Sequence, residues 1–145
     1  MVECRRAGRQ CPEARLPART LISVIDDDED VRISITSLLE SLGFTTEAFP
    51  SAVDFLVSDT IRHTHCLIAD VHMPHMTGLE LHRHLKQTDY SIPTILITAY
   101  PDDGVRNRAL DQGVIGYLPK PIEQDRLLGC IHFALERAKE DRDPS

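Results

Sequence analysis

Five short apolar segments alternate with stretches of helical periodicity, and this alternation constrains the fold more than any other feature of the chain. Each apolar segment is brief and mostly β-branched or aliphatic, which is typical of a buried strand. The segments are residues 21–25, 45–49, 65–69, 93–98 and 114–118. Between them, apolar residues recur at helical spacing, as at Val31, Ile35 and Leu39. The pattern predicts an α/β fold, a doubly wound (βα)5 domain with a parallel five-stranded sheet and helices on both faces.

Polar residues that could take part in a reaction stand at the ends of four of the five predicted strands, or directly after them. The residues are Asp26, Asp27, Asp70, Thr98 and Lys120. In an open parallel sheet, ligands bind beyond the carboxyl ends of the strands, near the point where the strand order reverses. A flavodoxin-like order of 2-1-3-4-5 makes the first and third strands neighbours, so their acids would share one pocket.

Three carboxylates in one pocket disfavour one another's ionisation, and a hard divalent cation is the usual remedy. Magnesium suits such oxygen ligands and keeps water or phosphate oxygens in its remaining positions. Carboxylates, a lysine and a hydroxyl together predict a phosphoryl-transfer site. One aspartate would attack phosphorus, Lys120 would pair with the phosphate product and Thr98 would hydrogen-bond to it.

The composition limits the classes of protein that the chain can represent. Its 145 residues suit one domain, and 41% are hydrophobic, as in a globular protein. The net charge of −7 argues against direct DNA binding and against binding to an anionic membrane. No apolar run approaches the ~18–20 residues of a membrane helix, and no secretory signal is evident. The four Cys include no metal-binding pair, so reduced thiols and a cytoplasmic location are predicted.

The two ends of the chain differ from its middle. Residues 1–20 show no strand or helix period and carry +3, from five Arg and two Glu, so residues 21–145 carry −10. We predict a flexible basic extension at 1–20, a domain at 21–140 and a charged end at 141–145. The extension is either a docking arm for an acidic partner or a leader without a function of its own.

Four motifs in order resemble the receiver domain of two-component response regulators, in particular the FixJ-type branch, and are also similar to the single-domain CheY type. The resemblance covers about residues 20–138. The motifs are Val-Ile-Asp-Asp-Asp-Glu-Asp-Val-Arg at 24–32, Leu-Ile-Ala-Asp-Val-His-Met-Pro-His-Met-Thr-Gly-Leu-Glu-Leu at 67–81, Ile-Leu-Ile-Thr-Ala-Tyr at 95–100 and Gly-Tyr-Leu-Pro-Lys-Pro at 116–121. Each motif is modest alone, but the set at this spacing is specific.

The resemblance implies a role for each motif residue. Asp70 would be the phosphoacceptor, and Mg²⁺ would bind Asp70, Asp27, Asp26 through water, and the backbone carbonyl of His72. Lys120 would contact the phosphoryl group, and its bond to Pro121 would be cis. Thr98 and Tyr117 would form the switch pair, with Tyr117 turning into the space that Thr98 leaves. The chain would then be a signalling domain rather than a metabolic enzyme.

The resemblance also implies partners. A sensor histidine kinase or a phosphotransfer protein would donate the phosphoryl group. The face formed by the fourth helix, fifth strand and fifth helix would contact a downstream protein or a second copy in a homodimer. The chain has no DNA-binding domain after the receiver, so we expect a stand-alone form that acts through a protein contact.

Several alternatives remain at this point. The chain is either a phosphorylated switch or a vestigial receiver that serves as a phosphorylation-independent scaffold. A phosphatase of the haloacid-dehalogenase kind would need Thr or Val at position 30, where Asp stands. A calcium loop starting at Asp26 lacks its glycine and its closing glutamate. Asp28 and Asp30 are interpreted as helix-entry residues. The seven His are interpreted as solvated surface residues, with a metal or pH-sensing site as the alternative.

Overall fold

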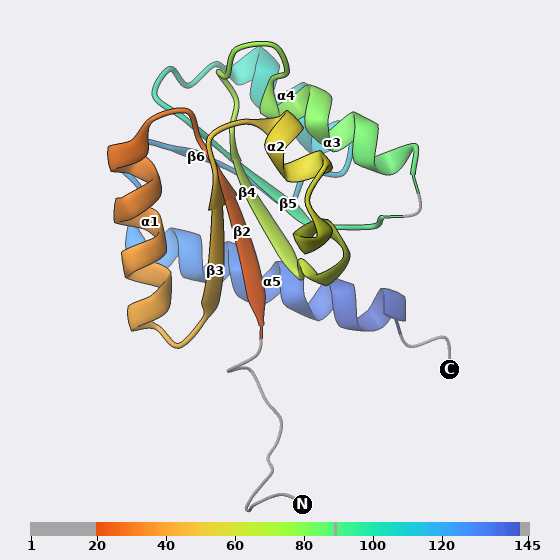
Figure 1. Cartoon of the computed structure of the whole chain (residues 1–145). Coiled ribbons are helices and arrows are strands. Elements are labelled where there is room, and N and C mark those ends of the chain that lie inside the picture. The colour runs from red at the N-terminus through yellow and green to blue at the C-terminus, as the bar shows by residue number, and fades with distance from the viewer. Residues whose placement is uncertain (1–19, 89, 143–145) are drawn as a thin grey trace, which may run out of the picture.

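The computed structural model describes residues 20–88 and 90–142, and it forms one parallel sheet of five strands (Figure 1). The strands are β2 (Leu21–Ile25), β3 (Thr45–Phe49), β4 (Cys66–Asp70), β5 (Thr94–Thr98) and β6 (Gly116–Pro119). Their spatial order is β3-β2-β4-β5-β6, with every pair parallel. Numbered along the chain this is 2-1-3-4-5, so the predicted fold and strand order are confirmed. The predicted basic extension lies almost wholly outside the described residues.

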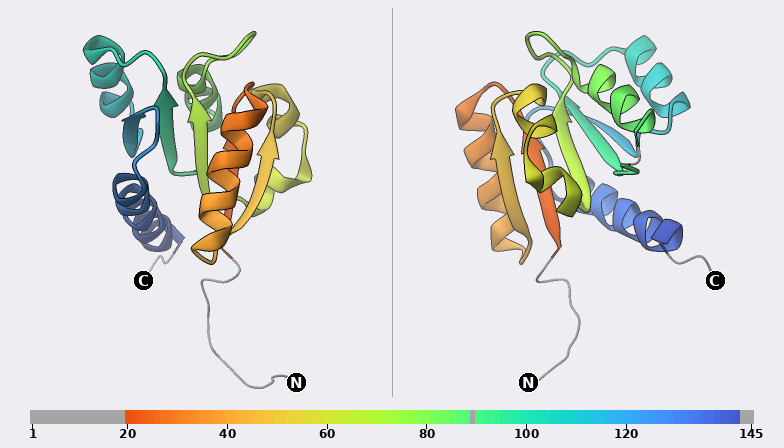
Figure 2. Two further views of the ribbon diagram at one scale, coloured as in Figure 1. Left: turned by 90° about the vertical axis from the view of Figure 1, so that its left-hand side faces the viewer. Right: turned by 45° about the vertical axis from the view of Figure 1, so that its right-hand side comes forward.

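Helices cover both faces of the sheet (Figure 2). They are α1 (Glu29–Ser41), α2 (Ala52–Leu56), the 3-10 helix η4 (Asp59–His63), α3 (Gly78–Lys86), α4 (Asp103–Asp111) and α5 (Gln124–Arg142). Apolar residues of α1 and α5 form one core with one face of the strands, and those of α2, α3 and α4 form a second core with the other face. The interior strands β4 and β5 are therefore buried at every position.

Short polar side chains start the helices that flank the sheet edge. Asp28 caps α1 by accepting a hydrogen bond from the Asp30 amide, which confirms its interpretation as a helix-entry residue. Thr77 and Glu80 form a reciprocal capping box at α3, and Asp102 accepts from the Val105 amide at α4. These caps fix where each helix leaves the loop that follows a strand. The loops that follow the polar strand ends therefore lead into helices whose first residues are fixed.

One interpretation of the sequence is wrong. His82 does not belong with the solvated surface histidines, because its side chain is only 5% exposed in α3. It lies three residues from Leu79 and three from Leu85, so it belongs to the buried stripe of that helix. His63, His72, His75, His84 and His132 are exposed, as expected for surface residues.

Candidate phosphoryl-transfer site

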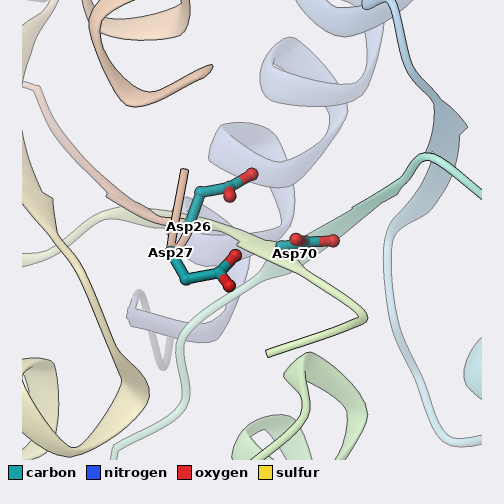
Figure 3. A group of neighbouring side chains, drawn as sticks. All are labelled: Asp26, Asp27 and Asp70. Atoms are coloured by element: carbon teal, nitrogen blue, oxygen red, sulfur yellow. The ribbon is translucent and has the colours of Figure 1, made fainter. Parts of the chain in front are cut away.

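Three aspartates meet beyond the carboxyl ends of β2 and β4 (Figure 3). Asp26 and Asp27 follow β2 directly, and Asp70 is the last residue of β4. Because β2 and β4 are paired neighbours, these ends lie side by side. One carboxylate oxygen from each residue lies within 4.8 Å of the other two, with Asp26 and Asp70 buried and Asp27 exposed. The acids that the sequence pattern indicates are thus brought into one cluster.

Lys120 joins this cluster from the end of the fifth strand. Its Nζ donates to Asp26 Oδ2 at 2.8 Å and to Asp70 Oδ2 at 3.3 Å. Burial alone would lower the pKa of Lys120, but the hydrogen bond and charge of Asp26, helped by Asp70, outweigh it and the pKa is raised. Lys120 is thus held as a cation. The peptide bond between Lys120 and Pro121 is cis.

The Asp70 carboxylate has a distinctive electrostatic setting. Burial and the nearby charge of Asp26 raise its pKa, and these effects exceed the opposing ones of the His72 amide and Lys120. The backbone N–H of His72 donates to Asp70 Oδ1 at 3.2 Å. One lysine offsets three carboxylates only in part, so the pocket retains excess negative charge. That excess is the condition under which a divalent cation binds well.

The donor set fits magnesium rather than a softer metal. All three side chains offer carboxylate oxygens, the ligands that Mg²⁺ prefers. No imidazole or thiolate belongs to this group of candidate ligands in the described part of the chain. His72 follows Asp70 closely, but its side chain is exposed and its ring packs edge-on against Tyr100, with centroids 5.7 Å apart.

Thr98 and Tyr117 lie on neighbouring strands, β5 and β6. Thr98 is fully buried and its Oγ1 accepts from the Tyr100 amide at 2.9 Å. Tyr117 is 9% exposed, and its hydroxyl accepts from the Asp102 amide at 3.0 Å. The side chain of Tyr117 is therefore already turned into the protein, where it reaches the start of α4.

Sequence reasoning missed two contacts around the cluster. Arg32 donates from Nη1 to the backbone carbonyl of Asp26 at 2.6 Å, which ties the start of α1 to the end of β2. Gly78 packs so closely that a Cβ there would lie 2.6 Å from the carbonyl oxygen of Asp70. Arg32 is the last residue of the first motif and Gly78 lies in the second. Both residues could therefore be seen in the sequence, but the motifs did not indicate what they contact.

Comparison with known proteins gives a consistent result. The family model described as the response regulator receiver domain matches residues 22–132. The response regulator protein TodT of Pseudomonas putida is 37% identical over 123 residues, which are 85% of this chain and 54% of TodT. The transcriptional regulatory protein FixJ of Bradyrhizobium diazoefficiens is 35% identical over 118 residues, 81% of this chain and 58% of FixJ. The chain thus spans little more than half the length of these relatives.

Solved structures agree with the sequence matches. The response regulator StyR superposes with a TM-score of 0.78 at 38% identity, over 86% of this chain and 63% of StyR. The crystal structure of FixJ-N superposes with a TM-score of 0.73 at 31% identity, over 81% of this chain and 94% of that one. The family-model match over residues 22–132 includes the strand ends that carry the acidic cluster.

Proposed function

This chain belongs to the response regulator receiver domain family, and we propose that it is a switch controlled by phosphorylation of Asp70. The observation that carries the proposal is the carboxylate cluster around Asp70, with Lys120 bonded to both Asp26 and Asp70. A sensor histidine kinase or a phosphotransfer protein would be the donor, and the chain would act in the cytoplasm. No helix within residues 20–88 and 90–142 has the length and apolar character to cross a membrane.

Asp70 would act as the nucleophile. A carboxylate oxygen of Asp70 attacks phosphorus, the bond from phosphorus to the donor's nitrogen breaks, and an acyl phosphate forms. Asp27, Asp70 and the backbone carbonyl of His72, with Asp26 through water, would hold a Mg²⁺ ion that neutralises charge on the phosphoryl oxygens. Lys120 would pair with the transferred group as its bond to Asp70 is given up.

The switch would work through Thr98 and Tyr117. A phosphoryl group on Asp70 attracts the Thr98 hydroxyl, which would leave its bond to the Tyr100 amide. The loop from Tyr100 to Asp102 then moves, and Tyr117 follows because its hydroxyl bonds to the Asp102 amide. Small shifts at Asp70 would in this way reach the start of α4.

We propose an output surface on α4, β6 and α5. A shallow cleft lies between β6 and α5, and its lining includes Phe133, which has 53% of its surface exposed. Tyr117 lines the same cleft, so one residue contacts both the loop after Thr98 and this surface. A downstream protein or a second copy of the chain would bind here. In this proposal the domain acts through a protein contact.

The test is labelling with small phosphodonors. We expect acetyl phosphate or phosphoramidate with Mg²⁺ to add one phosphoryl group to the chain, detected by intact mass and lost in base. Asp70→Asn should abolish the adduct, whereas Asp125→Asn, at an exposed acid in the first turn of α5, should keep it. An adduct that survives in Asp70→Asn would refute the assignment. An unlabelled wild-type chain would favour the phosphorylation-independent scaffold.

A further inference from the structure

The peptide group between Asp26 and Asp27 joins two of the proposed magnesium ligands, and a side chain of α1 holds it. Arg32 Nη1 donates to the carbonyl oxygen of this peptide, that of Asp26, at 2.6 Å. Arg32 lies near the start of α1, and its own amide donates to the Asp28 carbonyl oxygen at 3.1 Å. The guanidinium therefore extends from a fixed part of the helix back to the loop that carries the acids.

The Asp26 carboxylate is held by contacts of its own. Asp26 is fully buried, and its amide donates to the Phe49 carbonyl oxygen at 3.2 Å. Its Oδ1 accepts from the Asp28 amide at 2.9 Å, and its Oδ2 accepts from Lys120 Nζ at 2.8 Å. Both carboxylate oxygens thus have donors that do not involve Arg32. The direction of this side chain is fixed without the bond from α1.

The Asp27 carboxylate has no such support. Its side chain is exposed, and it makes no hydrogen bond or ion pair in the part of the chain that the structure describes. One of its oxygens nevertheless lies within 4.8 Å of ligand oxygens of Asp26 and Asp70 (Figure 3). A side chain without bonds takes its direction from its backbone. The bond from Arg32 holds the peptide group that leads into that backbone.

The charge and the hydrogen bond of Arg32 act on a metal ion in opposite directions. A cation beside the cluster repels Mg²⁺, so loss of the charge alone should tighten metal binding. Loss of the hydrogen bond frees the peptide before Asp27, which should weaken metal binding. The sign of the change in affinity therefore shows which of the two effects is larger.

We propose that Arg32 is a positioning residue of the magnesium site and that it acts through Asp27, by holding the peptide group that leads to it. The inference rests on the proposed function, because it concerns the ion that phosphoryl transfer to Asp70 would use. Groups that orient metal ligands commonly contribute about 10- to 100-fold to metal affinity. Arg32 is only half-buried, so solvent and salt screen its repulsion of the ion, whereas its hydrogen bond is direct.

The test is the Mg²⁺ affinity of the ¹⁵N-labelled full chain at constant ionic strength, followed by the amide shifts of Val71 and His72. We expect Arg32→Met to bind Mg²⁺ about 10-fold more weakly than wild type. Arg62→Met removes an equal charge from an exposed position of η4 and should leave the affinity unchanged. Equal or tighter binding in Arg32→Met would overturn the proposal. The amide shift of Ile68 in β4 should match wild type, which shows that the variant is folded.

A double-mutant cycle tests whether Arg32 acts through Asp27. Arg32→Met added to Asp27→Asn should cause no further loss of affinity, because the ligand that Arg32 directs is already gone. Losses that add would mean that Arg32 acts on the pocket without Asp27, and this result would refute the proposed role.

The outcomes separate this inference from the proposed function. A wild-type chain whose amide shifts do not respond to Mg²⁺ would refute the metal site and the inference together. A wild-type chain that binds Mg²⁺ and is labelled at Asp70, with unchanged affinity in Arg32→Met, would refute the positioning role alone.

Discussion

At the scale of single residues, Lys120 is shared unequally between two carboxylates. Its Nζ lies 2.8 Å from Asp26 and 3.3 Å from Asp70, so Asp26 is its nearer partner. A phosphoryl group on Asp70 would compete for the same ammonium with more charge and more oxygens than the carboxylate has. The residue that links the two strand ends is therefore the one best placed to detect the modification.

A second residue-scale consequence concerns His82 and acid stability. Because burial and Lys86 lower its pKa in the folded state, the unfolded chain binds a proton near pH 6.5 before the folded chain does. Stability is then lost as the pH falls through 6.5 toward the folded value. We expect urea unfolding from about pH 7.5 to about pH 5 to show a steeper loss for wild type than for His82→Gln.

The exposed His84, two residues along the same helix, is the control for this prediction. His84→Gln should keep the wild-type slope of stability against pH. Equal slopes in wild type and His82→Gln would show that His82 titrates alike in the folded and unfolded states.

At the scale of elements, the start of α3 is pressed against the end of β4. A Cβ on Gly78 would lie 2.6 Å from the Asp70 carbonyl oxygen and 2.9 Å from Leu96 Cδ2. We expect Gly78→Ala to destabilise the fold by about 1–3 kcal/mol, as overpacking does. Gly129→Ala is the matched control, because a Cβ at that position in α5 would meet nothing within 4 Å. It should stabilise the fold by up to about 1 kcal/mol. Urea unfolding measures both, and a neutral Gly78→Ala would contradict the close approach.

The link between β6 and α4 is a second element-scale prediction. Tyr117→Phe removes the hydroxyl that accepts from the Asp102 amide, and Asp102 in turn caps α4 through the Val105 amide. We expect amide hydrogen exchange at Asp102 and Val105 to accelerate about 2- to 10-fold. Tyr90→Phe, whose hydroxyl has no partner among the described residues, should leave α4 unchanged. Unaltered exchange in Tyr117→Phe would show that α4 is held by other contacts.

The elements also show how far the sequence can predict this structure. Continuous apolar runs predicted β4 and β5, and acids after strands predicted the carboxylate cluster. The 3-10 helix η4 has one buried residue, Ile61, so it has no period to detect. Helix α5 continues to Arg142, past the last apolar position of its stripe, because charged Lys, Glu and Arg are good helix formers. The bond from Tyr117 to Asp102 spans fifteen positions and has no local sequence signal.

At the scale of the whole molecule, one site depends on three separate strands. Asp26, Asp70 and Lys120 reach it from different parts of the chain, so only the folded state assembles it. Mg²⁺ should then stabilise folding by about 2.7 kcal/mol at 100 times its Kd. We expect the unfolding temperature to rise by about 5–10 °C with Mg²⁺.

Asp27→Asn tests the origin of that gain. It removes one carboxylate of the cluster, so the rise with Mg²⁺ should shrink, while the metal-free protein should become more stable through relief of like charge. Asp125→Asn should keep the full rise. Thermal unfolding by circular dichroism, with and without Mg²⁺, measures each case. A full rise in Asp27→Asn would place the ion elsewhere.

The direction of the chain through the fold has a practical consequence. Strand β2 begins, and α5 ends, at the side of the molecule away from the carboxylate cluster (Figures 1 and 2). A fluorophore attached next to the start of β2 or next to the end of α5 would therefore lie away from a kinase that approaches the carboxylate cluster. A pair of fluorophores there would report on overall unfolding and be nearly silent to phosphorylation. A reporter of the switch needs a label on α4, whose first turn is bonded to Tyr117 through Asp102.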